Sequence, residues 1–311
     1  MSRARRVVPG TTYLLTRRCA RRCFFLKPRR DGRSRRLFAY CLAVAAVRYG
    51  IEVHAIQVLS NHWHAVVSDP GGKLSFFMRD LGSLTARAFN TLLGRGESFW
   101  APGSFSAVEL HGRGAVLDKL LYVFANVTRA GLVARPGAWP GLTTHPEDFG
   151  ARVLRTARPE QFFRQLGAEE GGLPETAALP ITRPPGFEDL GDQELRALIR
   201  ERLEGRLRVI HADREANGLG PFLGPEGVLG QDPLAGAGST FPDRGVDPVI
   251  ACRDVNERKE RLRELVAWRR AYRAAWLQWR SGDREAVFPF GTFWMRVTHH
   301  ARCERAPPLA A

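Results

Sequence analysis

The sequence has 311 residues, 44% of them hydrophobic, which is enough to bury the core of one large or two ordinary domains. Lys and Arg number 47 against 32 Asp and Glu, a formal net charge of +15, so we expect attraction to polyanions, with nucleic acid as the first partner to consider. There is no uncharged apolar run of about 18 residues and no signal-peptide pattern. These features argue against membrane-spanning and secreted proteins, and we expect a cytoplasmic protein with no membrane partner.

Segments typical of strands and of helices alternate between residues 8 and 147. Runs of β-branched residues predict strands, and apolar residues three or four positions apart predict helices. The predicted strands are 11–16, 51–60, 62–68 and 105–111, and the predicted helices are 35–50, 73–94 and 115–133. This order fits an α+β fold of the ferredoxin-like or RRM-like type, an antiparallel sheet with helices on one face. The other face would then be free for a ligand.

The remainder of the sequence divides into two further parts. Frequent Pro and Gly over 148–190 predict a linker after the first domain, 1–147. The last part, 191–311, is basic and predicted to be a mainly helical C-terminal extension, although residues 288–300 are predicted as a turn and a strand.

Two histidines stand one residue apart in the stretch "LSNHWHAVV", residues 59–67. Side chains alternate along a strand, so His62 and His64 share one face while Trp63 points to the other. Such a pair can bind a divalent cation. Two ligands alone do not define a site, however, and the pattern fits equally well a histidine pair on the polar face of an ordinary strand.

Tyr122 and Asn126 lie four residues apart in the predicted helix 115–133, which places both on one helix face. The phenol of Tyr122 is a candidate nucleophile, and the amide oxygen of Asn126 could complete a His, His, Asn set around Mg²⁺ or Mn²⁺. The alternative, from these residues alone, is that the Tyr122 ring packs in the core.

Together these stretches resemble a known family. "SNHWHAVV" resembles the HUH motif (His, bulky apolar residue, His) of single-tyrosine transposases of the insertion-sequence type. "LYVFANVTRAGLV" resembles the helix of REP-associated tyrosine transposases, which reads roughly Tyr-Ile-x-x-Asn-Pro-Val-x-x-Gly. The resemblance covers about residues 8–145. Val127 stands where the family usually has proline, a difference expected to affect the shape of that helical turn rather than the reacting groups.

The resemblance implies that residues 1–147 are the catalytic domain, with Tyr122 as nucleophile and His62, His64 and Asn126 as ligands of Mg²⁺ or Mn²⁺. It implies cleavage and transfer of single-stranded or hairpin DNA through a 5′-phosphotyrosine, without ATP, in a monomer or in a homodimer whose tyrosine acts in trans. Phosphate contacts are expected from a group of arginines near the end of the first strand: Arg17, Arg18, Arg21 and Arg22. A non-catalytic nucleic-acid-binding regulator, and a replication initiator or relaxase, remain as alternatives.

Overall fold

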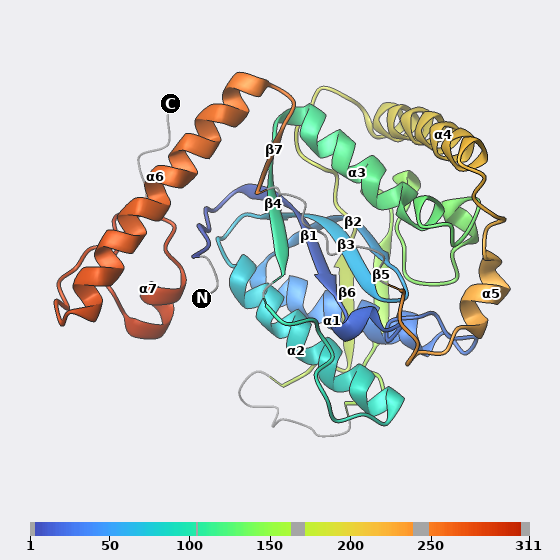
Figure 1. The fold of residues 1–311 in the computed structure, drawn as a ribbon, viewed down its shortest axis with the longest axis horizontal. Helices are drawn as coiled ribbons and strands as arrows, with labels where there is room; N and C mark the ends of the chain where they lie inside the picture. The colour runs from blue at the N-terminus through green and yellow to red at the C-terminus, as the bar shows by residue number, and fades with distance from the viewer. Residues whose placement is uncertain (1–3, 104, 163–171, 239–248, 306–311) are drawn as a thin grey trace.

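A five-stranded sheet forms the centre of the protein (Figure 1). The structure, a computed structural model, describes residues 4–103, 105–162, 172–238 and 249–305. In spatial order the strands are β2 (Glu52–Val58), β3 (His62–Asp69), β1 (Thr11–Arg18), β4 (Ser106–His111) and β7 (Ile250–Cys252). Neighbouring strands are antiparallel except that β7 runs parallel to β4. The predicted α+β fold class is confirmed, and the C-terminal part of the chain contributes a strand to its sheet.

β3 occupies a central position, because it pairs with β2 in the predicted hairpin and with β1 along its full length. A register shift at His54 interrupts the pairing with β2, as in a β-bulge. The His54 ring is fully buried, with Nε2 2.8 Å from Ser68 Oγ and Nδ1 3.0 Å from Thr182 Oγ1. The first contact lies within the hairpin, and the second joins the hairpin to a distant segment of the chain.

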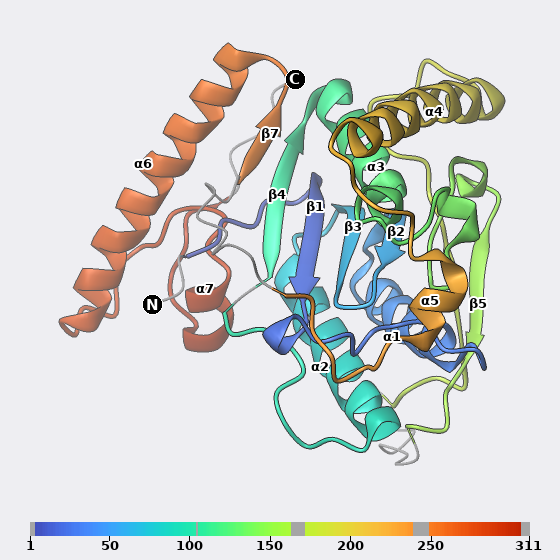
Figure 2. The same cartoon turned by 45° about the vertical axis from the view of Figure 1, so that its right-hand side comes forward.

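Helices cover both faces of the sheet. α1 (Arg33–Tyr49) and α2 (Leu74–Leu93) pack against each other on one face, where the Trp63 ring meets the Phe38 ring edge-on with centroids 6.0 Å apart. α3 (Gly112–Arg129) crosses the opposite face, in contact with β2, β3 and β4 (Figures 1 and 2). The expected free face is therefore covered in part by α3, because the apolar side of this helix is buried against the sheet.

The predicted linker, 148–190, contains a second, two-stranded antiparallel sheet that packs on α1. The helix α4 follows and lies on α3. The bounds in this part of the chain are β5 (Val153–Ala157), β6 (Thr176–Pro180), α4 (Asp192–Ala216) and α5 (Gly224–Gly230). Short 3₁₀ turns lie earlier in the chain, at Ala20–Arg22 after β1 and at Pro136–Ala138 and Pro146–Asp148 after α3.

The C-terminal helices α6 (Val255–Arg280) and α7 (Trp294–His299) stand beside the β7 edge of the sheet (Figure 2). α7 lies where the sequence predicted a strand. That prediction was wrong because short apolar runs are ambiguous in periodicity, and here Met295 packs with Ala275 and Phe288 in a small core of its own. None of the helices in the described ranges is long and apolar enough to cross a membrane.

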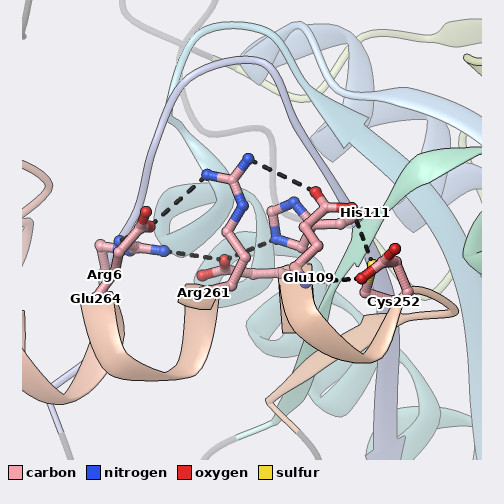
Figure 3. Close-up of polar contacts among 8 residues, drawn as sticks. Arg6, Glu109, His111, Cys252, Arg261 and Glu264 are labelled. Atoms are coloured by element: carbon pink, nitrogen blue, oxygen red, sulfur yellow. Dashed lines mark hydrogen bonds and ion pairs between the residues drawn. The ribbon is translucent and has the colours of Figure 1, made fainter. Parts of the chain in front are cut away.

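Ion pairs attach α6 to the sheet (Figure 3). Arg6 lies between Glu109 of β4 and Glu264 of α6, with nitrogen–oxygen distances of 3.3 and 3.9 Å. Arg261 lies 3.7 Å from the same Glu264 carboxylate, and His111 Nε2 lies 3.4 Å from Glu109. Arg6 and Glu109 are mostly buried, so solvent screens this pairing less than it screens an exposed ion pair.

Candidate active site

His62 and His64 lie on the sheet face that α3 crosses, with ring centroids 4.8 Å apart. One nitrogen of each ring already has a partner: His62 Nδ1 is 2.6 Å from Asn61 Oδ1, and His64 Nδ1 is 2.7 Å from Thr16 Oγ1. An amide oxygen only accepts, so His62 Nδ1 donates and Nε2 retains its lone pair. Metal-binding histidines are typically oriented in this way, by a hydrogen bond from the second ring nitrogen.

Both histidines are held in the neutral form. Burial lowers the pKa of His62 to about 4, with further lowering by the charges of Arg18 and Arg22. Burial also lowers the pKa of His64 well below its usual value, and His62 and Arg18 add to the effect. At neutral pH neither ring carries a proton that would compete with a cation for its lone pair.

Tyr122 points at this pair from α3. Its phenolic oxygen is 3.4 Å from His64 Nε2, and the two rings meet edge-on with centroids 5.1 Å apart. Gly112, the first residue of α3, has a φ of 75°, a conformation that lets the chain turn from β4 directly into the helix. The predicted histidine and tyrosine residues thus converge within one chain.

Two cations flank the Tyr122 ring, and the sequence analysis missed both. Lys119 Nζ and Arg129 Cζ each lie 6.0 Å from the ring centroid. They are three residues before and seven residues after Tyr122, so they share its helix face together with Asn126. This spacing is the feature of the sequence from which both cations could have been predicted. The positive charges are placed to balance negative charge on a phenolate or a phosphate.

Asn126 is 7% exposed, and its Nδ2 atom has no hydrogen-bond partner among the residues that the structure describes. Leaving a buried amide unpaired costs about 1–3 kcal/mol. A half-turn of the amide would place its oxygen where the unpaired nitrogen now lies, so that a cation could take an oxygen ligand there. The described residues contain no group of three or more His, Cys, Asp or Glu placed to hold a metal ion. The candidate ligands are the two imidazoles, together with the Asn126 amide on the helix face that carries Tyr122. The amide oxygen suits Mg²⁺ or Mn²⁺, and imidazole nitrogens bind divalent cations more generally.

Val127, where the family usually has proline, uses its backbone N–H. It donates to Gln57 Oε1 at 3.2 Å, and Gln57 lies opposite His64 in the β2–β3 pairing. α3 continues through this position to Arg129. The hydrogen bond therefore anchors the end of α3 to β2, the strand next to the one that carries the histidines. α3 remains helical at the position where a change of shape was expected.

The four predicted phosphate-binding arginines are not grouped together. Arg17 lies on the face opposite the histidines, with its guanidinium 4.9 Å from the Trp100 ring and 3.4 Å from the carbonyl of Met78, and burial lowers its pKa. Arg18 and Arg22 are close enough to His62 to affect its pKa, and the side chain of Arg21 is exposed. Arg18 and Arg22 thus lie at the site, whereas Arg17 packs beneath the sheet.

Comparisons with known proteins found similarity only among solved structures. No protein-family model and no curated protein matches the chain. A REP-associated tyrosine transposase bound to a REP hairpin is similar over 55% of this chain and 97% of its own, with 19% identity and a TM-score of 0.40. A presumed transposase from Deinococcus radiodurans R1 is similar over 35% of this chain and 85% of its own, with 19% identity and a TM-score of 0.27. Because both TM-scores are below 0.5, function has to be inferred from this chain's own residues.

Proposed function

We propose that the protein is a transposase that cuts and rejoins single-stranded or hairpin DNA through a covalent link to Tyr122. The observation that carries this proposal is the 3.4 Å approach of the Tyr122 phenol to His64 Nε2, beside a second histidine whose Nδ1 is also engaged. A structural tyrosine in a core needs no such pair of neutral imidazoles. A nucleophile acting on a phosphodiester needs a nearby group that holds the phosphate.

The reaction exchanges one phosphate ester for another. The Tyr122 oxygen attacks phosphorus, the bond from phosphorus to the 3′-oxygen of the upstream nucleotide breaks, and the phenolic proton ends on that 3′-hydroxyl. The product is a 5′-phosphotyrosine, which a different 3′-hydroxyl can attack in the reverse sense to join a new strand. Since the link conserves the ester bond, no ATP is needed.

Each residue of the site has a defined task in this reaction. His62, His64 and Asn126 would hold Mg²⁺ or Mn²⁺, and the bound ion would supply the positive charge that polarises a non-bridging phosphate oxygen. Lys119 and Arg129, 6.0 Å from the tyrosine ring, offset the charge that develops on the phenol and the phosphate.

The proposed substrate follows from charge and access. The net charge of +15 favours nucleic acid, and Arg18 and Arg22 beside His62 offer contacts to a backbone that approaches the histidines. Because α3 crosses this sheet face, we propose a single strand rather than a duplex as the substrate. One of the similar structures contains a REP hairpin, which is the kind of DNA proposed here. Since Tyr122 and His64 approach each other within one chain, the mechanism is proposed for a single subunit.

The test is covalent capture. The protein is incubated with single-stranded hairpin DNA and Mn²⁺ or Mg²⁺ and analysed on a denaturing gel. We expect an adduct with wild-type protein, none with Tyr122→Phe, and an undiminished adduct with the control Tyr49→Phe, whose hydroxyl instead bonds Asp80. An adduct that persists in Tyr122→Phe refutes the mechanism. If wild type forms no adduct and both proteins bind the DNA equally, the non-catalytic regulator is the better description.

A further inference from the structure

A cavity of about 460 Å³ opens beside the end of β1, where three distant segments meet. Arg21 and Phe25 come from the turn after β1, Arg95 and Ser98 from the turn after α2, and Leu234 from the segment after α5. Figure 2 shows this last segment passing the end of β1. Small-molecule sites measure roughly 300–1,000 Å³, so the cavity can hold one nucleotide but not a duplex.

A single residue, Asn61, connects this cavity to the histidine pair. Its Nδ2 donates to the carbonyl of Arg22, in the turn that forms one wall, at 3.1 Å. Its Oδ1 accepts from His62 Nδ1 at 2.6 Å, and its carbonyl accepts from the N–H of Cys19 at 2.8 Å. One amide group therefore links the turn beside the cavity to His62.

The cavity wall combines a flat cation with apolar surface. The guanidinium of Arg95 lies over the Phe25 ring at 3.8 Å and is 3.2 Å from Glu97, so two neighbours hold its plane. One of its nitrogens, Nη1, is buried and has no hydrogen-bond partner among the described residues. Leu234 is 58% exposed at the cavity. Unpaired bases stack on guanidinium planes and apolar side chains in this way.

The turn that supplies Arg21 is strained and firmly held. Arg21 and Arg22 have φ angles of 51° and 57°, which L-residues other than glycine rarely adopt. Gly236 packs so closely that a Cβ there would lie 2.9 Å from the Arg21 carbonyl, and the N–H of Phe24 donates to Ala235. Strained backbone that its surroundings maintain is characteristic of functional sites. Its effect here is to present the Arg21 side chain to solvent at the cavity.

We propose that this cavity is a nucleotide subsite, in which an unpaired base stacks on Arg95 and its phosphate pairs with Arg21. The position of that nucleotide rests on the proposed function: it adjoins the phosphate held at His62 and His64. The subsite supplies affinity for a single strand, because a paired base inside a duplex cannot enter it.

The test measures binding to full-length Tyr122→Phe protein without metal, so that no cleavage can contribute. The probes are dAMP, dCMP, dGMP and TMP, with 2-deoxyribose 5-phosphate as the matched probe that lacks a base, followed by titration calorimetry. We expect nucleotides to bind about tenfold more tightly than the sugar phosphate. Arg95→Lys, which retains charge but loses the plane, should abolish that difference, and Arg21→Gln should weaken all five probes by a similar factor.

Two further variants test whether a change in affinity comes from the cavity or from a general change in the protein. Leu234→Asp changes an exposed residue, so the fold should survive while nucleotide affinity falls at least about fivefold. Arg208→Gln, on the exposed side of α4, should have no effect. Equal affinity for nucleotides and the sugar phosphate, or a base preference that survives both Arg95→Lys and Leu234→Asp, overturns the subsite. Nucleotide binding with no covalent adduct in wild type would refute the cleavage mechanism and leave the subsite standing.

Discussion

Asn61→Ala should impair the site without touching any reacting group. The side chain makes the 2.6 Å hydrogen bond that fixes the His62 ring. Without this acceptor, the neutral imidazole can move its proton to Nε2, and the lone pair needed for a cation is lost. Removing such an orienting partner typically costs 10- to 100-fold in metal affinity or activity, equivalent to about 1.4–2.7 kcal/mol.

The second hydrogen bond of Asn61 allows this effect to be separated from loss of stability. Its Nδ2 donates to the Arg22 carbonyl at 3.1 Å, a bond worth about 1 kcal/mol. Asn61→Ala loses both bonds, whereas Asn61→Asp retains an acceptor for His62 and loses only the donor. Both variants should therefore unfold at lower urea concentration, but only Asn61→Ala should need more Mn²⁺.

The assay is the single-turnover rate of adduct formation as a function of Mn²⁺ concentration. We expect the half-saturating Mn²⁺ concentration of Asn61→Ala to rise about 10- to 100-fold, and that of Asn61→Asp to stay within about threefold of wild type, since the ring orientation is kept. A wild-type Mn²⁺ dependence in Asn61→Ala would show that this hydrogen bond does not orient a ligand. Equal defects in the two variants would assign the effect to the fold.

Three other outcomes follow from the site and its surroundings. Burial lowers the pKa of His54 to about 4, below its unfolded value of about 6.5, so the unfolded chain binds the proton more tightly. The free energy of unfolding should hold above about pH 6.5, and His54 alone should lower it by about 2 kcal/mol by pH 5. His62 and His64, whose pKa values burial also lowers, add to this fall. Urea titrations that show no change between pH 7 and pH 5 would contradict this. Lys119→Gln and Arg129→Gln should each slow adduct formation about tenfold with little change in melting temperature, and unchanged rates would remove these cations from the mechanism. Arg17→Met should lower the free energy of unfolding and leave the salt dependence of DNA binding unchanged, whereas Arg18→Gln should flatten that salt dependence. The opposite result would show that Arg17 contacts DNA phosphate and that Arg18 does not.

Local periodicity was sufficient to predict each half of the candidate site, the histidine pair on its strand and the tyrosine–asparagine pair on its helix. The alternation of a strand puts His62 and His64 on one face, and the helical repeat puts Tyr122 and Asn126 on one face. The predicted helix ends at Gly50 and Gly94 are also observed, each in the left-handed conformation of a helix cap. These features depend on residues a few positions apart, so the sequence alone could predict them.

The sequence by itself determined which side chains share a face, because that depends on backbone geometry within a few residues. Only the tertiary structure decided which faces meet. It brought Tyr122 to 3.4 Å from His64, fifty-eight positions away in the sequence. It also placed the Arg17 guanidinium over the Trp100 ring, and Leu234 at the same cavity as Arg21 and Arg95. It also decided that residues 294–299 form a helix. These outcomes depend on the packing of segments far apart in the chain, for which the periodicity of one segment holds no information.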